Sequence, residues 1–512
     1  MTTSKDTTKV HKPWTEVVTE KRALRDARID KHLKSDIKFP SDGISFETVD
    51  IDVLTSLLRD RKVSAVEVIH AHSRACEAQK QTNCLTEICF DDALEQATQL
   101  DEFQQEHGQL MGPLHGVPVT VKDQFNIRGL DSTLGYVAKA FSPAESDAPL
   151  VQTLKKLGAV IIAKTNLPQS IMWCETNNPL WGLTTHPEDP KLTPGGSSGG
   201  EAAMLLMGAS IIGWGTDIGG SIRIPCHMNG LWGLKPSSGR LSYRGVEVTL
   251  EGQQHIPSAV GPMARSLSCL KLVTKLAIEA EPWAIDPQLP PVPWRDGIFQ
   301  ATSTRPLSVF RDLVTKLEAA GHEVIEWDSS LNSSIIDIMD GYYSADGGED
   351  IRSAVSAGGE PFIPQIQAFV NRGEPISVFE YWQLNKRKIA IQEAYHDMWD
   401  NKRSPTSRPV DVLLVPTMPH TAVPHGSCRW TGYTKIFNLL DYTALTFPAG
   451  KAPRGENDGS FWEHVPRNEV DAWNQRLYDP VTMGGRHVGL QIVGRRFEEE
   501  KVPIVLKPKC IF

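Results

Sequence analysis

Two glycine-rich bends place serines where chemistry could occur. Residues 194–201 read PGGSSGGE and residues 215–223 read GTDIGGSIR, with one apolar segment between them. Glycine lets backbone amides turn toward a bound group. Together with Lys122, which ends the apolar run 117–121, the bends supply a serine nucleophile, a second serine hydroxyl and an amine base. These are the parts that an acyl-transfer site needs when no histidine acts as the base.

Lys122 can act as a base only if its amine is neutral. An ordinary lysine has a pKa of about 10.4, so a few molecules in ten thousand are neutral at pH 7, a deficit of roughly 4 to 5 kcal/mol. Burial in a dry pocket removes most of that deficit. The apolar residues before Lys122 favour burial. The alternative is an ordinary surface charge paired with its neighbour Asp123.

Ser221 has the better position for a nucleophile, because it follows a buried strand and a tight turn. Successive amides of that turn are expected to point at one oxyanion, and such donors are typically worth about 3 to 4 kcal/mol each in the transition state. The amides belong to Ile218, Gly219, Gly220 and Ser221. Asp217 and Arg223 flank the turn and are expected to pair and hold it rigid, which is a structural role.

Ser198 raises a rival interpretation, because Gly196, Ser198 and Gly200 match the G-x-S-x-G nucleophile elbow. An elbow needs a strand that leads into the serine. Residues 189–194 carry two prolines and cannot form a central strand. Ser198 is therefore expected to be a structural residue near the site.

The elements that must position these residues alternate along the chain. Short apolar strands separated by amphipathic helices predict an α/β fold, with a sheet covered by helices on both faces. The helices are predicted at 17–33, 64–79, 92–105, 147–157, 199–207 and 307–320. The strands are predicted at 117–121, 159–163, 210–214, 323–327, 412–416 and 488–493.

The bulk composition excludes several classes of protein. A net charge of -9 gives no basic surface for nucleic acid. The eight cysteines contain no CxxC pair, and the chain has no HExxH or nucleotide-binding template, so neither a metal nor a cofactor is expected. No run of 18 apolar residues predicts a membrane span, and the first 14 residues contain no secretion signal. A cytoplasmic protein is expected.

These motifs resemble the amidase signature family, and within it the fungal acetamidase-like branch and the fatty-acid amide hydrolases. The resemblance covers nearly the whole chain. It rests on GPLHGVP at 112–118, VKD at 121–123, the block 194–236, YSADG at 343–347, NLLDY at 438–442, YDP at 478–480 and GLQIVGRR at 489–496. It implies one α/β domain with a large mixed sheet, here residues 46–512, preceded by a helical arm, residues 1–45.

Carried over by position, the resemblance implies a catalytic triad of Lys122, Ser197 and Ser221. Ser197 would sit on a cis peptide bond and pass protons between Lys122 and Ser221, which would form the acyl-enzyme. The family oxyanion hole falls on the amides of residues 218–221. Its substrate wall falls on residues 170–177, where Ile171, Met172 and Trp173 indicate an acyl group larger than acetyl.

The sequence thus predicts hydrolysis of a small-molecule carboxamide to an acid and ammonia or an amine. Two alternatives stay open. An esterase or acyltransferase could use the same acyl-enzyme, because no residue fixes the leaving group or the acceptor. A binding protein could also keep the fold without the activity. A homodimer is likewise left open.

Overall fold

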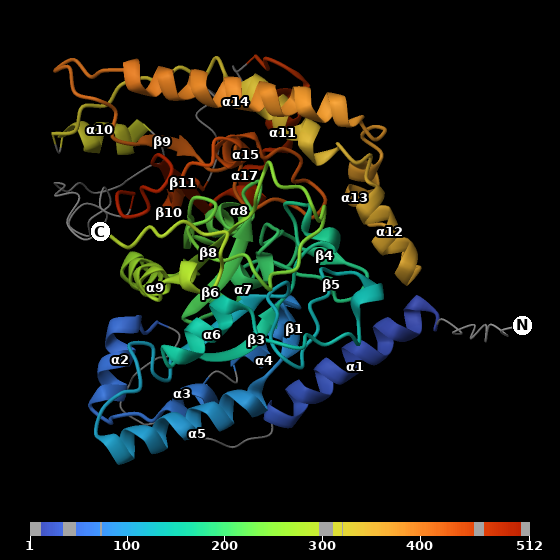
Figure 1. Ribbon diagram of the computed structural model, residues 1–512, viewed down its shortest axis with the longest axis vertical. Coiled ribbons are helices and arrows are strands. Elements are labelled where there is room, and N and C mark those ends of the chain that lie inside the picture. Colours follow the sequence, from blue (N-terminus) through green and yellow to red (C-terminus); the bar gives the residue numbers. More distant parts are fainter. Residues whose placement is uncertain are drawn as a thin grey trace, which may run out of the picture.

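A nine-stranded mixed sheet runs through the centre of the molecule (Figure 1). The structure is a computed structural model that describes residues 12–33, 48–71, 74–295, 311–319, 321–454 and 465–502. The strand order is β1-β3-β2-β6-β8-β7-β10-β11-β9. β2 pairs in parallel with β3 and with β6, and the other pairs in this sheet are antiparallel. The predicted α/β architecture is confirmed.

The strands are short and mostly buried. The central sheet contains β1 (Leu85–Ile88), β2 (Pro118–Lys122), β3 (Val160–Thr165), β6 (Ile212–Asp217), β7 (Trp232–Lys235), β8 (Ala259–Ala264), β9 (Leu413–Pro416), β10 (Ala444–Lys451) and β11 (His487–Val493). β4 (Asn177–Asn178) and β5 (Gly182–Leu183) form a separate small hairpin.

Helices cover both faces of the sheet and extend beyond its two ends (Figure 1). In chain order they are α1 (Trp14–Leu33), α2 (Ile51–Arg59), α3 (Ala65–Ala71), α4 (Arg74–Thr82), α5 (Phe90–His107), η1 (Val137–Lys139), α6 (Pro149–Lys156), η2 (Gln169–Ile171), α7 (Gly199–Leu206), α8 (Arg223–Asn229), α9 (Leu267–Glu279), η3 (Pro282–Ala284), α10 (Arg311–Ala319), α11 (Asn332–Tyr343), α12 (Glu349–Gly358), α13 (Pro364–Val370), α14 (Val378–Asn401), α15 (Gly432–Leu439), α16 (Glu469–Leu477) and α17 (Pro480–Met483). Among the described residues, every helix is too short or too polar to span a lipid bilayer.

Two glycines in β6 allow α7 to approach the sheet closely. A Cβ at Gly213 would lie 2.4 Å from an oxygen of Glu201, and a Cβ at Gly215 would lie 2.7 Å from Ser198 Oγ. Side chains alternate along a strand, so Trp214 points to the opposite face, where it is fully buried in the main core. On the face of β6 that carries Gly213 and Gly215, the missing side chains leave room for α7 and for the serine-rich loop before it.

Helix α1, drawn in blue, lies along the outside of the sheet edge near β1 (Figure 1). Its Lys21 is buried and forms ion pairs with Glu87 of β1 and with Asp131, the latter at 2.6 Å. The predicted boundary of the arm at residue 45 falls in 34–47, outside the described residues. The division into residues 1–45 and 46–512 stays a prediction.

Most of the predicted elements are present, with one clear error. The capping box of α3 forms as expected, since Glu67 N donates to Ser64 Oγ at 3.1 Å and Ser64 N donates to Glu67 Oε2 at 2.7 Å. The strand predicted at 323–327 is wrong, because these residues pair with no strand of the described chain. Trp327 instead packs against Tyr395 and Trp399 of α14. Of the helix predicted at 307–320, only 311–319 lies within the described residues.

Candidate active site

Lys122 and the turn after β6 lie at the same edge of the sheet. β2 and β6 are parallel neighbours, with Val121 opposite Trp214, so both strands end at that edge. Lys122 is the last residue of β2 and is fully buried. Its Nζ lies 2.6 Å from Ser197 Oγ and 3.0 Å from Thr216 Oγ1. The structure thus brings together the amine and the first serine that the sequence singled out.

Burial lowers the pKa of Lys122 to about 7. The carboxyl groups of Asp217, Glu201 and Asp123 act in the opposite direction through space, but none of them accepts a hydrogen bond from the amine within the described chain. With a pKa near 7, about half of the Lys122 amines are neutral at pH 7. The amine therefore has the proton affinity that a general base needs at neutral pH.

Thr216 fixes the direction of the Lys122 amine. Thr216 Oγ1 lies 2.6 Å from Gln124 Oε1, which can only accept, so the threonine hydroxyl donates there. Gln124 is held in turn, because its Nε2 donates to the Glu247 carbonyl at 2.6 Å and to Tyr243 Oη at 3.1 Å. Thr216 must therefore accept from a Lys122 N–H, and this leaves the lone pair of a neutral amine free to face Ser197. The sequence analysis missed Thr216.

Glu201 of α7 lies beneath this edge and is fully buried. It accepts hydrogen bonds from Thr120 Oγ1 at 2.6 Å and from Thr165 Oγ1 at 2.8 Å. Burial raises the pKa of Glu201 to about 8, against the effect of the two hydroxyls and of Lys122. A carboxyl with this pKa is mostly neutral at pH 7, so it attracts the proton of Lys122 only weakly.

Ser197 lies in the loop before α7, and its side chain is almost completely buried. The peptide bond between Gly196 and Ser197 is cis, as the resemblance implied. The loop is packed tightly, since a Cβ at Gly196 would lie 2.7 Å from the backbone nitrogen of Glu175. Glycine is therefore required next to Ser197.

Ser221 follows the turn and keeps 9% of its surface exposed. Its carbonyl accepts a hydrogen bond from Ser198 N at 3.1 Å, which brings it beside the residue that follows Ser197. The Ser221 hydroxyl donates to no group of the described chain, and no hydrogen bond joins it to Ser197 Oγ. Of the three predicted triad side chains, Lys122 and Ser197 are thus in direct contact. Ser221 lies next to them, but its hydroxyl forms no hydrogen bond with either within the described chain.

The turn 218–221 is held from several sides. Asp217 Oδ1 accepts a hydrogen bond from Gly220 N at 2.8 Å. The Tyr343 hydroxyl donates to the Ile218 carbonyl at 2.9 Å, and the Thr434 hydroxyl donates to the Gly219 carbonyl at 2.6 Å. These two bonds pull the carbonyls of the turn to one side. Tyr343 is the first residue of the YSADG motif, but the motif gives it no role, and Thr434 belongs to no motif; both reach the turn from distant parts of the chain.

One expectation about this turn needs correction. The sequence analysis aligned four amides, from Ile218 to Ser221, on one oxyanion. The Gly220 amide is directed to the Asp217 carboxylate instead, because that carboxylate is buried and needs donors. The amides of Ile218, Gly219 and Ser221 have no hydrogen-bond acceptor within the described chain, so these three of the four predicted donors remain available to a bound oxygen.

Asp217 and Arg223 form the ion pair that the sequence predicted, and both side chains are fully buried. Arg223 Nη2 lies 2.9 Å from Asp217 Oδ1, and its Nε lies 3.0 Å from Oδ2. The guanidinium also donates to Asn438 Oδ1 at 2.6 Å and to Gln491 Oε1 at 2.9 Å. Burial alone would raise the pKa of Asp217, but Arg223 holds it well below its usual range. The pair fixes the start of α8 and the turn before it.

Ile171 and Met172 lie in the apolar cluster that also contains Tyr343 and, at its margin, Ile218 and Trp173. This cluster joins the proposed substrate wall to the turn of Ser221. Trp173 is only partly buried, and its indole Nε1 has no hydrogen-bond partner within the described chain. The predicted wall is therefore apolar, with one polar atom that a ligand could use.

Ser198 does not have the geometry of a nucleophile elbow. Its hydroxyl is completely buried and has no hydrogen-bond partner within the described chain. No strand leads into it, because residues 185–197 form only turns, bends, coil and isolated β-bridges. The structural role that the sequence analysis preferred for Ser198 agrees with this position.

Comparison with known proteins gives the family of this chain. The family model for amidases matches residues 67–502, so the chain belongs to the amidase signature family, whose members hydrolyse amides. It is 59% identical over 508 residues to "Amidase 1" of Gibberella moniliformis, covering 96% of this chain and 97% of that one. It is 33% identical to the acetamidase of Aspergillus oryzae over 95% of this chain and 96% of that one.

A solved structure agrees with these sequence relatives. The chain superposes on a fatty acid amide hydrolase with a TM-score of 0.84 at 30% identity, covering 96% of this chain and 89% of that one. A likeness over this much of both chains extends to the whole sheet and to the helices on either face. The single large α/β domain that the sequence predicted is confirmed.

Proposed function

We propose that this amidase hydrolyses its substrate through a seryl acyl-enzyme, with Ser221 as nucleophile, Ser197 as proton bridge and Lys122 as base. The observation that carries the proposal is the 2.6 Å contact between Lys122 Nζ and Ser197 Oγ in a site where the amine is fully buried. The lowered pKa of Lys122, about 7, and the orientation of its amine by Thr216 support the same assignment.

Acylation begins when the substrate amide enters beside Ser221. The Ser221 hydroxyl turns toward Ser197, and catalytic hydrogen bonds commonly close only in the complex with substrate. Neutral Lys122 takes the Ser197 proton, Ser197 takes the Ser221 proton, and Ser221 Oγ forms a bond to the carbonyl carbon. When the tetrahedral intermediate collapses, the C–N bond breaks and the proton returns through Ser197 to the leaving nitrogen.

Deacylation repeats these steps with water. A water molecule attacks the ester carbon and gives its proton through Ser197 to Lys122. The carbon–oxygen bond to Ser221 then breaks, Ser221 recovers its proton, and the acid leaves. In both halves, the amides of Ile218, Gly219 and Ser221 would stabilise the oxyanion, at about 3 to 4 kcal/mol for each well-placed donor.

The proposed substrate is a neutral carboxamide of small or medium size. Ile171, Met172 and Trp173 give the wall an apolar surface, which suits an acyl group larger than acetyl. The names of relatives range from acetamidase to fatty acid amide hydrolase, so the length of the acyl chain is the property to measure. We also infer a reducing, cytoplasmic compartment, because the seven described cysteines are buried and unpaired.

The test is ammonia release from a series of primary amides of increasing acyl length. We expect Ser221→Ala to lower kcat/KM by about 10⁴-fold or more, since it removes the nucleophile. Ser198→Ala is the matched control, because Ser198 has a hydroxyl in the same loop that the proposal does not use. A fluorophosphonate probe should label the wild type on Ser221. Equal rates for wild type and Ser221→Ala would refute the proposal.

A further inference from the structure

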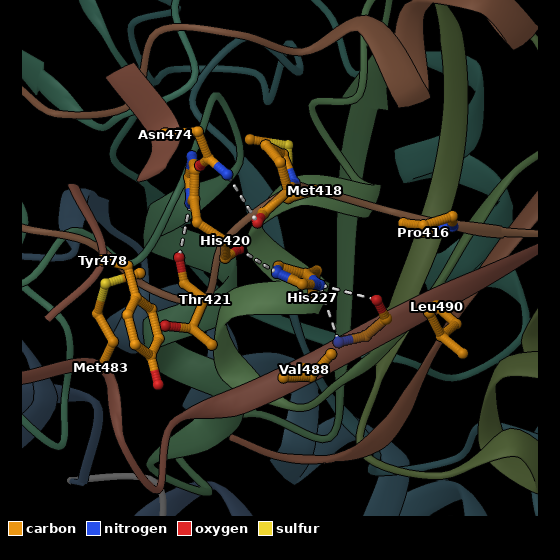
Figure 2. A pocket seen from close by; sticks show the side chains of 12 residues that line it. His227, Pro416, Met418, His420, Thr421, Asn474, Tyr478, Met483, Val488 and Leu490 are labelled. Carbon is orange, nitrogen blue, oxygen red and sulfur yellow. Dashed lines mark hydrogen bonds between the residues drawn. The ribbon is translucent and has the colours of Figure 1, made fainter. Parts of the chain in front are cut away.

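A cavity of about 270 Å³ lies at the end of α8 that is remote from Ser221 (Figure 2). Its lining includes His227 of α8, residues 488–490 of β11, residues 418–421, Asn474 and Tyr478. Most of the lining is apolar, and it contains no aspartate, glutamate, lysine or arginine. Lys122, Ser197 and Ser221 do not line it.

His227 lines this cavity, but both of its ring nitrogens are satisfied by backbone groups. Nδ1 lies 2.8 Å from Gly489 N and 2.9 Å from the Gly489 carbonyl, whereas Nε2 faces the His420 carbonyl, which can only accept. In the neutral ring, Nδ1 is therefore the acceptor and takes the Gly489 N–H. Nε2 therefore carries the proton and donates to the His420 carbonyl at 2.8 Å. Figure 2 shows these bonds fixing the ring between β11 and the 418–421 segment. His227 supports the cavity and offers no free group to a ligand.

His420 is different, because one of its nitrogens has no partner. Nδ1 lies 2.8 Å from the Thr421 carbonyl, which can only accept, so Nδ1 carries the proton. Nε2 is then an unprotonated acceptor, and it is buried without a hydrogen-bond partner in the described chain. His420 as a whole is only 7% exposed. Burial lowers its pKa to about 4, so the ring is neutral at pH 7.

A second acceptor without a partner lies in the same lining. Asn474 Nδ2 donates to the Pro419 carbonyl at 3.5 Å, whereas Asn474 Oδ1 is buried and accepts no hydrogen bond within the described chain. Buried polar atoms in proteins are nearly always satisfied, by protein groups, water or a ligand. Two such acceptors in one apolar cavity indicate that the cavity binds a molecule that donates hydrogen bonds.

We propose that this cavity is a second small-molecule site, separate from the catalytic one, for a neutral ligand with an apolar body and an N–H or O–H donor. Met418, Met483 and Leu490 would contact the body, and the thioethers of the two methionines suit an aromatic ring. His420 Nε2 and Asn474 Oδ1 would accept from the head group.

The charge of the lining decides between ligand classes. An anion would place its oxygens against two acceptors, and no cationic side chain lines the cavity to compensate. A cation would leave water without a carboxylate to replace its hydration. A neutral alcohol or primary amide avoids both penalties. The proposal does not depend on the catalytic assignment, because it uses none of the residues proposed for catalysis.

The experiment uses the full chain with ¹³C-labelled methionine methyl groups. Met418 and Met483 report on the cavity, and Met172 reports on the candidate substrate wall. Benzyl alcohol is the probe, ethylbenzene is its isostere without a donor, and benzoate is the anionic control. We expect saturable shifts of the Met418 and Met483 signals with benzyl alcohol while Met172 stays unchanged. Ethylbenzene should bind at least about fivefold more weakly, and benzoate should not bind.

Variants assign the binding to the two acceptors. His420→Phe keeps a ring of similar size, and it should reduce the affinity for benzyl alcohol to that for ethylbenzene. Asn474→Leu tests the second acceptor if His420→Phe does not fold. The proposal is overturned if Met418 and Met483 do not respond, if ethylbenzene binds as well as benzyl alcohol, or if Met172 shifts together with them at the same concentration.

Discussion

Several lysines of the described chain are buried, and two of them, Lys21 and Lys122, have opposite kinds of partner. Lys21 of α1 forms ion pairs with the carboxylates of Glu87 and Asp131 and joins the first helix to the sheet. Among the described residues, Lys122 of β2 forms hydrogen bonds only with the hydroxyls of Ser197 and Thr216. Both side chains are inaccessible to solvent or nearly so. The kind of partner, rather than burial itself, therefore separates Lys21 from Lys122, the proposed base.

The difference between carboxylate and hydroxyl partners shows how a buried amine can be kept neutral. A carboxylate within hydrogen-bond distance stabilises the charged form, whereas a hydroxyl gives much less compensation for lost hydration. Around Lys122, Asp217 is already neutralised by Arg223, and Glu201 has a raised pKa. The carboxyl groups near Lys122 thus exert less attraction on its proton than their number suggests.

Lys122→Met should have the largest effect on activity. We expect kcat/KM to fall by about 10³ to 10⁴-fold, because the variant removes the base and keeps a side chain of similar length. The free energy of unfolding should stay equal or rise, since a buried amine without an ion pair is replaced by an apolar group. Steady-state kinetics and urea unfolding on the same preparation measure both. A loss of less than tenfold would contradict the role of Lys122.

Lys21→Met should show the opposite pattern. It leaves two buried carboxyl groups without this partner, so we expect a loss of about 3 kcal/mol in the free energy of unfolding, while the activity of the folded enzyme is kept. Lys31→Met is the matched control on the same helix, because Lys31 pairs with Asp91 at the exposed surface. That change should cost less than about 1 kcal/mol. Equal losses of unfolding free energy in Lys21→Met and Lys31→Met would show that the buried ion pairs contribute no more to stability than the surface pair.

The pH dependence of kcat/KM should also distinguish Lys122 from Lys21. In the proposed mechanism neutral Lys122 is the active form, and its pKa is about 7, so activity should be low below that pH and should rise as the amine loses its proton. We expect kcat/KM to increase about tenfold from pH 6 to pH 8 and to level off above. Lys21→Met should keep this profile. A rate that is flat over this range would show that Lys122 does not titrate in the rate-limiting step.

Thr216→Val should give the smallest of these effects. The variant keeps the shape of the side chain but removes the hydroxyl that accepts from Lys122 and donates to Gln124. One lost hydrogen bond of about 1 kcal/mol corresponds to a decrease of about fivefold in kcat/KM. The midpoint of the pH profile should move as well, whereas a purely structural defect would lower the rate at every pH alike.

Local sequence signals predicted the parts of this fold that are continuous in the chain. The apolar run before Lys122, the capping box at Ser64 and the glycine bends each correspond to an element or turn in the structure. The strand predicted at 323–327 is wrong because a short segment rich in apolar residues also fits an extended stretch of chain packed on aromatic rings. Trp327 packs on α14, and no strand is available to pair with it.

The sequence predicted the site residues that belong to a motif, but not those that reach the site from distant parts of the chain. Lys122 and Ser197 were named from sequence, and the structure places them in contact. Tyr343 and Thr434, which hold the turn before Ser221, have no distinctive spacing. The engagement of the Gly220 amide by Asp217 depends on side-chain orientation, which a sequence pattern does not specify.

The connections of Arg223 have a consequence for how the enzyme is made. Its guanidinium bonds to Asp217, six residues earlier in the chain, and also to Asn438 and Gln491. A ribosome adds residues in order, so Gln491 is made 268 residues after Arg223. The loop that carries Ser221 thus acquires its full support only after Gln491 has been added, and a chain that stops before Asn438 would leave the guanidinium without two of its acceptors.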